Sequence, residues 1–198
     1  MSDAPSPKTS RGQRSRARII STTRQLLADA DLSSLKLDAV AEKSGVAKSS
    51  VLWHFGSKNG LLLAVVEDIF EGMQQLIQEM ELSDLDKRGR LKKMMLALAD
   101  EMQRTPEANT LLISFIVNQT LDQTIIAQIK SMYGSYRQFI RRMLESSGVP
   151  VDDHLPAVIL ALIDGAFLQW YLQPDQISLR DLFARSIDLM TLDQAGRN

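Results

Sequence analysis

The segment from Leu37 to Phe55, LDAVAEKSGVAKSSVLWHF, constrains the fold more than any other part of the chain. Leu37, Val40 and Ala41 have the i, i+3, i+4 spacing that gives a helix one apolar face. Gly45 stands where this helix must end, because glycine adopts the left-handed C-cap conformation without steric cost. A second short helix follows and ends at Phe55. The segment therefore predicts two helices joined by a tight turn.

The second of these helices is expected to bury Val51, Leu52 and Phe55 and to expose polar and aromatic side chains. The predicted exposed set is Lys48, Ser49, Ser50, Trp53 and His54. Such a face has little catalytic chemistry, whereas short donors beside a cation suit base edges and phosphates in a DNA groove. This is the helix-turn-helix pattern, in which the second helix enters the major groove.

Within that helix, base contacts are expected from its first residues, Lys48, Ser49 and Ser50. His54 is expected to donate to a phosphate. Trp53 either lies against a phosphate or a thymine methyl group, or packs in part against the first helix of the chain. A glycine-joined helix pair also occurs in many all-α proteins that do not bind DNA, so the charge of the surrounding chain has to be considered.

Charge is distributed unevenly along the chain. Residues 1–60 hold ten Lys and Arg against five Asp and Glu, and the remainder holds thirteen against nineteen. A basic N-terminal third on an acidic body favours a nucleic-acid-binding module. Residues 1–13 are predicted to form a disordered basic arm. Arg14 and Arg18 are predicted to lie along phosphates or in a minor groove; alternatively, this basic group is a frayed tail that only speeds association.

Helical periodicity continues to the C-terminus, and no stretch alternates with period two for long enough to predict a strand. The predicted class is all-α with about nine helices. Besides the pair above, helices are expected over residues 14–30, 90–104, 106–119, 122–147 and 155–172, in a stretch of about 24 residues from Lys58, and from Ser178 onward. Residues 14–57 would form the DNA-binding domain and residues 58–198 an effector-binding and dimerisation domain. Lys58 would lie near a phosphate at the junction.

The helix predicted over residues 155–172, LPAVILALIDGAFLQWYL, is apolar on almost every side. Such a helix must be buried all round, so a second subunit is expected to cover one face, giving a four-helix interface in a homodimer. A central buried helix in a monomer is the alternative. Asp164 inside this helix needs a partner, which could be the neighbouring subunit or a ligand. The predicted interface residues are Leu162, Asp164, Gly165, Leu182, Phe183, Ile187 and Met190.

A second set of side chains predicts an effector pocket in the C-terminal part. Methionine adapts to irregular shapes and aromatic rings offer flat surfaces, so an apolar or aromatic ligand is favoured. Residues of this kind at helical spacing more often form plain core, and the chain could also lack an effector. The predicted lining is Met94, Met95, Met102, Phe115, Tyr133, Tyr136, Phe167 and Trp170.

Several classes of function are not expected. The chain has no cysteine, which excludes thiolate zinc sites, and its two histidines lie about a hundred residues apart, so neither a metal site nor an enzyme is predicted. No cofactor is expected. The N-terminus lacks the apolar core of a signal peptide, and no run approaches the ~18 apolar residues of a membrane span, so a cytoplasmic location without a membrane partner is predicted.

Over about residues 14–70 the chain resembles the TetR family of one-component transcriptional regulators. The resemblance lies in residues 37–41, Gly45-Val46, Lys48, Val51, His54-Phe55, Ser57-Lys58 and Leu61-Leu62. Further along, only the helix layout and the segment Ala161-Leu162-Ile163-Asp164-Gly165 are similar. The resemblance implies a homodimer with an N-terminal DNA-binding module, a C-terminal ligand pocket, and a fourth helix that transmits ligand binding to the spacing of the two DNA-reading helices.

Three positions depart from the family pattern. Lys36 stands where the family usually has Ser or Thr, Ala47 replaces a Ser or Thr at the start of the recognition helix, and Leu52 occupies the place of a phosphate-contacting Tyr. The hypothesis is that phosphate contacts come instead from Lys36, Ser49, Trp53, His54 and Lys58. The function expected is a dimeric repressor on a palindromic double-stranded DNA operator, released by a small effector; the alternative is a helical adaptor without sequence-specific DNA binding.

Overall fold

The computed structural model describes residues 7–28, 35–117 and 123–195. All regular secondary structure in these ranges is α-helical, which confirms the predicted all-α class. The helices are α1 Pro7–Ala28, α2 Leu37–Ser44, α3 Lys48–Phe55, α4 Lys58–Gln78, α5 Lys87–Arg104, α6 Pro106–Val117, α7 Gln123–Ser146, α8 Leu155–Leu172 and α9 Leu179–Ala195.

Two helices begin earlier than the sequence predicts. The first, α1, starts at Pro7 and not at Arg14, so the prediction of a disordered arm is wrong for residues 7–13, and residues 1–6 lie outside the described ranges. Proline is well suited to a first helical turn, where its missing N–H is not needed. The fifth, α5, begins at Lys87 because the Asp86 side chain caps it, accepting the N–H of Gly89 at 2.8 Å.

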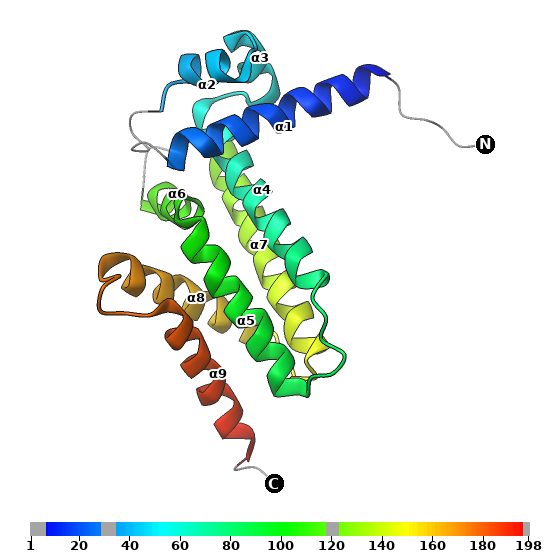
Figure 1. Cartoon of the computed structure of the whole chain (residues 1–198), viewed down its shortest axis with the longest axis vertical. Coiled ribbons are helices and arrows are strands. Elements are labelled where there is room, and N and C mark those ends of the chain that lie inside the picture. The colour runs from blue at the N-terminus through cyan, green and yellow to red at the C-terminus, as the bar shows by residue number, and fades with distance from the viewer. Residues whose placement is uncertain (1–6, 29–34, 118–122, 196–198) are drawn as a thin grey trace, which may run out of the picture.

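The helices form a small N-terminal cluster set on a longer bundle (Figure 1). Helices α1, α2 and α3 pack together at one end of the molecule, and α1 crosses the start of α4. Helices α4 and α7 run the length of the bundle side by side. At the other end α5 packs against α9, and α7 packs against α8. Helix α4 is therefore the element that joins the two parts.

The hydrophobic core follows α4 through this junction. One cluster of buried side chains runs from α1, α2 and α3 through Leu61–Ile69 of α4 to α6 and α7. A second cluster takes up Met73 and Ile77 of α4 with α5, α7, α8 and α9. The core is thus continuous across the domain boundary that the sequence predicts after residue 57. Because protein cores are close-packed, a displacement of α4 would also move the N-terminal helices that pack against it.

Helix α8 has one buried and one exposed apolar face. Ile159, Ile163 and Phe167 are buried, whereas Leu162 is 45% and Leu172 66% exposed. By length and composition alone this helix could cross a membrane, so the prediction that no segment approaches that length is wrong. Only 28% of the helix is buried, and a soluble protein rarely leaves such a large apolar face uncovered.

Part of the predicted dimer interface lies inside the protomer. Phe183 and Ile187 of α9 are 2% and 1% exposed, because they pack into the second core cluster. They offer almost no surface to another subunit, so their assignment to the interface is wrong. Leu182 is half-buried and Gly165 is exposed, and the side chain of Met190 lies outside the described part of the chain.

Candidate DNA-binding surface and effector cavity

The turn between α2 and α3 is fixed by backbone hydrogen bonds. Gly45 lies at φ 63° and ψ 38°, in the left-handed region, and its N–H donates to the carbonyl of Glu42 at 3.0 Å. The N–H of Val46 donates to the carbonyl of Ala41, also at 3.0 Å. This is the glycine-ended helix stop that the sequence predicted. It sets the direction in which α3 leaves α2.

Helix α3 buries a narrower stripe than the sequence predicts. Val51 is 1% exposed, but Leu52 is 40% exposed, so the prediction that Leu52 is buried is wrong. Neighbouring residues on a helix lie about 100° apart, and an eight-residue helix on a small core buries only one of the two. Trp53 is 80% exposed, which favours the predicted contact with DNA over packing against α1. Its ring meets the His54 ring edge-on at 4.7 Å.

The first turn of α3 presents the residues predicted to contact bases. Lys48 and Ser49 are exposed and Ser50 is half-buried. The Nζ of Lys48 lies 3.0 Å from Oδ2 of Asp38 on α2, an exposed ion pair that the sequence did not predict. The N-cap residue of α3 is Ala47, whose side chain cannot accept a hydrogen bond from the first turn of the helix. The backbone N–H groups of that turn are therefore suited to bind an anion such as phosphate.

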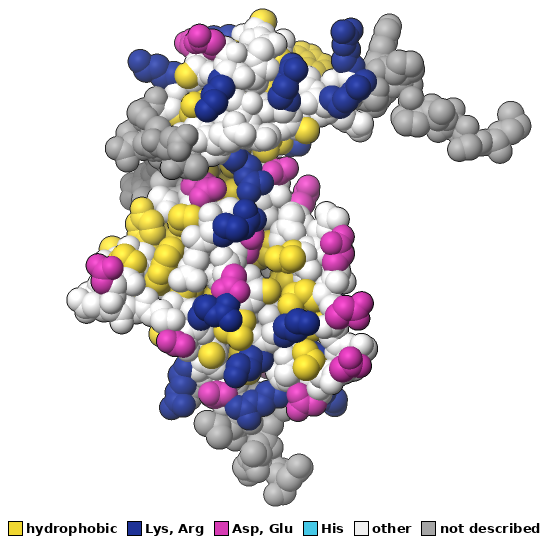
Figure 2. Space-filling model, viewed as in Figure 1, with side chains coloured by type: hydrophobic (Ala, Val, Ile, Leu, Met, Phe, Trp, Pro, Cys, Tyr) yellow, Lys and Arg dark blue, Asp and Glu magenta, His cyan; other side chains and the backbone are white. Residues whose placement is uncertain are grey.

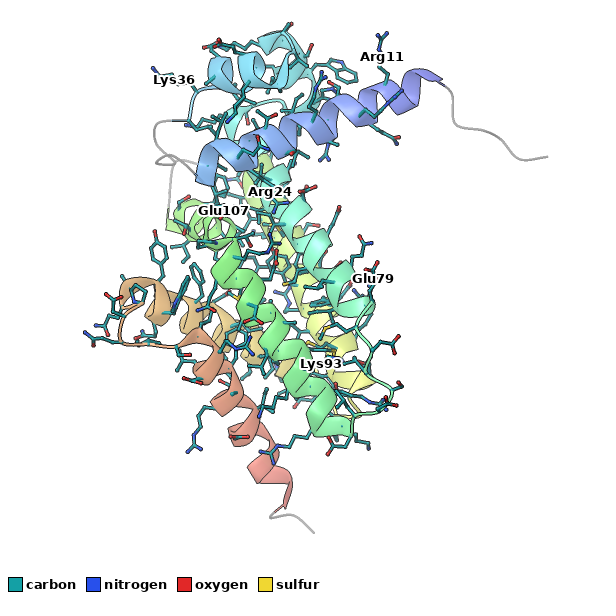
Figure 3. The ribbon with its side chains drawn as sticks, viewed as in Figure 1. Arg11, Arg24, Lys36, Glu79, Lys93 and Glu107 are labelled. Atoms are coloured by element: carbon teal, nitrogen blue, oxygen red, sulfur yellow. The ribbon has the colours of Figure 1, made fainter. Side chains whose placement is uncertain are left out.

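Basic side chains flank α3 from three elements. Figure 2 shows Lys and Arg side chains gathered over the N-terminal helices, with Asp and Glu more frequent on the body. Lys36 is exposed at the entry of α2, where it makes no capping hydrogen bond, and Lys58 opens α4 (Figure 3 labels Lys36). Arg14 and Arg18 are exposed on α1. All the DNA-contact candidates are thus on or beside the same end of the molecule.

Two contacts tie α1 to the helices around it. The Arg16 guanidinium lies 5.5 Å from the centre of the Phe55 ring, a cation–π contact with α3. Arg24, labelled in Figure 3, forms an ion pair with Asp68 of α4, with Nη1 3.1 Å from Oδ2. Both sites are partly exposed, so each contact adds little to stability. Their importance is that specific side chains hold α1 both to α3 and to α4.

A cavity of about 70 Å³ lies in the bundle, where α4, α5, α6, α7 and α8 converge. It is several times larger than the space one water needs. Most of its lining is aliphatic or aromatic, with Phe70, Tyr136 and Phe139 forming an aromatic group; the Phe70 ring lies 4.0 Å from the Tyr136 ring and 5.7 Å from the Phe139 ring.

The polar lining of this cavity consists mainly of carboxyl and hydroxyl groups. Asp164 of α8 accepts a hydrogen bond of 3.4 Å from the hydroxyl of Tyr133. Burial raises the pKa of Asp164 to about 6, and burial beside this carboxyl raises the pKa of Tyr133 to about 12. Burial also raises the pKa of Tyr136. Glu101 is held by its neighbour Arg104, whose Nε and Nη2 lie 2.9 and 2.6 Å from the carboxylate oxygens.

The predicted pocket overlaps this cavity only in part. Met102 and Tyr136 line it, and Tyr133 reaches its Asp164 wall. The other predicted residues lie elsewhere in the described structure: Met94, Met95 and Phe167 are in the second core cluster, Phe115 is in the first, and Trp170 packs on Phe167. None of the five lines this cavity, although Met95 lines a second, smaller one beside α8 and α9. Periodicity shows which side of a helix is buried but not where packing leaves space.

Several lining residues were missed by sequence reasoning. Phe70 and Phe139 had been recognised only as helix-core residues, and Glu101 and Asn109 had not been singled out. Asp164, for which a subunit contact or a ligand contact was predicted, lines the cavity. Its position in an otherwise apolar helix was the available signal, and it pointed to a ligand as well as to a subunit contact.

This geometry is that of a helix-turn-helix DNA-binding protein with a separate cavity in its helical bundle. Residues 19–65 match the family model of bacterial regulatory proteins of the tetR family. The chain is 25% identical to the "Probable HTH-type transcriptional regulator ArpR" of Pseudomonas putida over 179 residues, 84% of this chain and 85% of that protein. Residues 19–65 therefore carry the DNA-binding segment of the TetR family, and the chain as a whole is similar to transcriptional regulators of that family.

Solved structures share the same fold. A TetR transcriptional regulator from Rhodococcus sp. RHA1 superposes with a TM-score of 0.68 at 19% identity, covering 90% of this chain and 96% of that one. The repressor FadR of Thermus thermophilus, solved in complex with lauroyl-CoA, also gives a TM-score of 0.68, at 16% identity, covering 89% of this chain and 93% of that one. These two comparisons establish the architecture only.

Proposed function

We propose that the protein is a cytoplasmic transcriptional repressor that binds a palindromic operator as a homodimer and is released by a small, largely apolar effector. The observation that carries the proposal is the exposed face of α3. Lys48, Ser49 and Trp53 project from a helix that the Gly45 turn holds out from the core. This is the helix that enters the major groove in helix-turn-helix proteins.

Contacts to the DNA backbone would come from the basic residues around α3. Lys36, Lys58, Arg14 and Arg18 lie on the elements that flank the recognition helix, and His54 lies near its end. These contacts would position α3, while Lys48, Ser49, Ser50 and Trp53 would contact bases. Neutralised phosphates release counterions, so affinity should fall steeply as salt rises.

The exposed apolar face of α8 supports the dimer. Leu162, Leu168 and Leu172 are each at least 40% exposed on one helix, and a second copy would cover them by two-fold symmetry. Gly165 and the half-buried Leu182 would lie at the same interface. A dimer would present two copies of α3 to half-sites about one DNA turn apart, roughly 34–36 Å.

The cavity supports effector control. It is bounded by Val66, Ile69 and Phe70 of α4, and α4 also carries Asp68, which binds Arg24 of α1. A ligand that separates the helices around the cavity would displace α4 and with it the DNA-binding helices. The ligand must bind the displaced conformer more tightly, because equal affinity for both conformers would cause no release.

The direct test is selection of bound sequences from a random duplex pool at near-physiological salt with the full-length protein. A two-fold symmetric motif is expected, and its half-site spacing would report the distance between the two α3 helices. Recovery of no motif, together with no affinity for any duplex at low salt, would contradict the proposal and support the adaptor alternative.

A further inference from the structure

We propose that the cavity binds an apolar ligand carrying a cationic amine or ammonium group, anchored by the Asp164 carboxylate and the aromatic group of Phe70, Tyr136 and Phe139. The proposal names the chemical class of the effector and so rests on the proposed function for its regulatory meaning. Binding itself can be measured without DNA.

The first argument is the charge of the cavity lining. Asp164 and Glu101 both line the cavity, whereas no Lys, Arg or His does among the residues that the structure describes. Glu101 is already neutralised by the two hydrogen bonds from Arg104. Asp164 is in none of the ion pairs of the described residues and receives a single long hydrogen bond from Tyr133. The Asp164 carboxylate is therefore the negative charge of the described lining with which a ligand could form an ion pair.

The second argument is the free energy of that carboxylate. Burial raises the pKa of Asp164 to about 6, so the group is still ionised at neutral pH, in surroundings that disfavour its charge. A buried charge becomes far more favourable once an opposite charge lies beside it. A bound cation would supply that charge, whereas an anionic ligand would face repulsion.

The third argument is the aromatic surface beside the carboxylate. The rings of Phe70 and Tyr136 lie 4.0 Å apart, and those of Tyr133 and Tyr136 lie 5.6 Å apart. Aromatic faces attract cations, and such groups are a common means of binding ammonium ligands. The remaining walls, which include Leu98, Met102 and Leu160, suit the apolar part of the same molecule.

The chemistry of the lining also differs from that expected of a site for an anionic headgroup. The acyl-CoA found in the Thermus thermophilus repressor carries phosphates, which need cationic or N–H donors. The described lining of the present cavity holds two carboxylates, two hydroxyls and the single amide of Asn109, and no cationic side chain.

The test uses three probes with one skeleton: phenylbutylamine, phenylbutanol and phenylbutanoate. Titration calorimetry with the full-length protein at about pH 7.5, where the amine is protonated and Asp164 is ionised, should give the tightest binding for the amine. In Asp164→Asn the affinity for the amine should fall about tenfold or more, while the affinity for the alcohol changes less than about threefold. Asp175→Asn is the matched control, because Asp175 is exposed in the loop after α8 and lies outside the cavity lining.

Equal binding of amine and alcohol by the unaltered protein would overturn the proposal, as would tighter binding of phenylbutanoate or no measurable binding of the amine. The same three probes should be added to a protein–operator complex. Binding of the amine without release of DNA would support the ligand class and refute the regulatory role, so that the two failures can be told apart.

Discussion

The Nζ of Lys48 lies 3.0 Å from Oδ2 of Asp38, so the cation at the start of the recognition helix is paired with an acid of the preceding helix. Both side chains are more than half exposed, and such a pair contributes at most about 1 kcal/mol. Its consequence concerns binding more than stability. The pair must open, or share its proton donors, when Lys48 meets DNA.

Asp38→Asn should therefore strengthen DNA binding at low salt. The change frees Lys48 and removes a negative charge beside the phosphates, so affinity for random duplex should rise several-fold. Fluorescence anisotropy over a series of salt concentrations would measure it. Glu79→Gln is the matched control, since Glu79 lies at the far end of α4 (Figure 3) and should leave affinity unchanged. Weaker binding by Asp38→Asn would mean that the pair positions Lys48 for base contact.

Lys48→Ala should lower operator affinity about tenfold to a hundredfold, because one base-contacting side chain accounts for roughly 1–3 kcal/mol of discrimination. Dimerisation should not change, since α3, which begins at Lys48, lies far from α8 in Figure 1. Gel shift and analytical ultracentrifugation would measure the two properties. Lys92→Ala, which removes an exposed charge on α5, serves as the control. Equal loss of dimer and DNA binding would show that α3 has been misassigned.

Gly45→Ala should destabilise the protein by about 1–2 kcal/mol, the cost of the left-handed conformation for a residue with a side chain. An added Cβ would meet no atom within 4 Å at this position, so the backbone conformation at φ 63° is the whole cause. Gly72→Ala is an informative control, because Gly72 is also unobstructed but lies within α4. There alanine should stabilise by roughly 0.5–1 kcal/mol. Chemical denaturation would show whether the two effects have opposite signs.

Leu162→Asp should convert the dimer to monomers while the helical fold remains. Leu162 is 45% exposed on α8, so a charge there would disrupt a subunit interface without entering the protomer core. Size-exclusion chromatography and circular dichroism would measure the two properties. The comparison is Leu76→Asp on α4, where a leucine is 46% exposed on another helix. If Leu162→Asp stays dimeric, the exposed face of α8 is not the interface.

Asp164→Asn should increase the stability of the folded protein at neutral pH, and this increase should disappear at acidic pH. The folded-state pKa of Asp164 is raised to about 6 from 3.8, so the folded state binds the proton more tightly than the unfolded state does. Its contribution to stability is therefore full below about pH 4 and declines as pH rises through about 6. At neutral pH the ionised group costs up to about 3 kcal/mol, which the amide avoids. Melting temperatures of both proteins between pH 4 and 8 should diverge as pH rises; parallel curves would contradict the prediction.

Much of the fold was contained in local sequence patterns. Helices α3 and α8 begin and end where the sequence predicted, and the turn at Gly45 has the predicted left-handed geometry. These features depend on neighbours three or four residues apart and on the conformational freedom of glycine. The family resemblance also rested on this stretch, and the family match over residues 19–65 includes it.

Only the tertiary structure decided which apolar residues face a cavity, the core or a second subunit. Phe183 and Phe167 were predicted to contact a partner and a ligand, yet both are buried within the protomer, while Phe70 lines the cavity. Helical periodicity gives the buried side of each helix, but the space left between five helices depends on how all their side chains pack at once. For the same reason Lys48 and Asp38, on different helices, could not be paired from sequence alone. The sequence determined the helices and the DNA-binding turn; packing between distant segments determined the cavity, its unpaired carboxylate and the exposed face of α8.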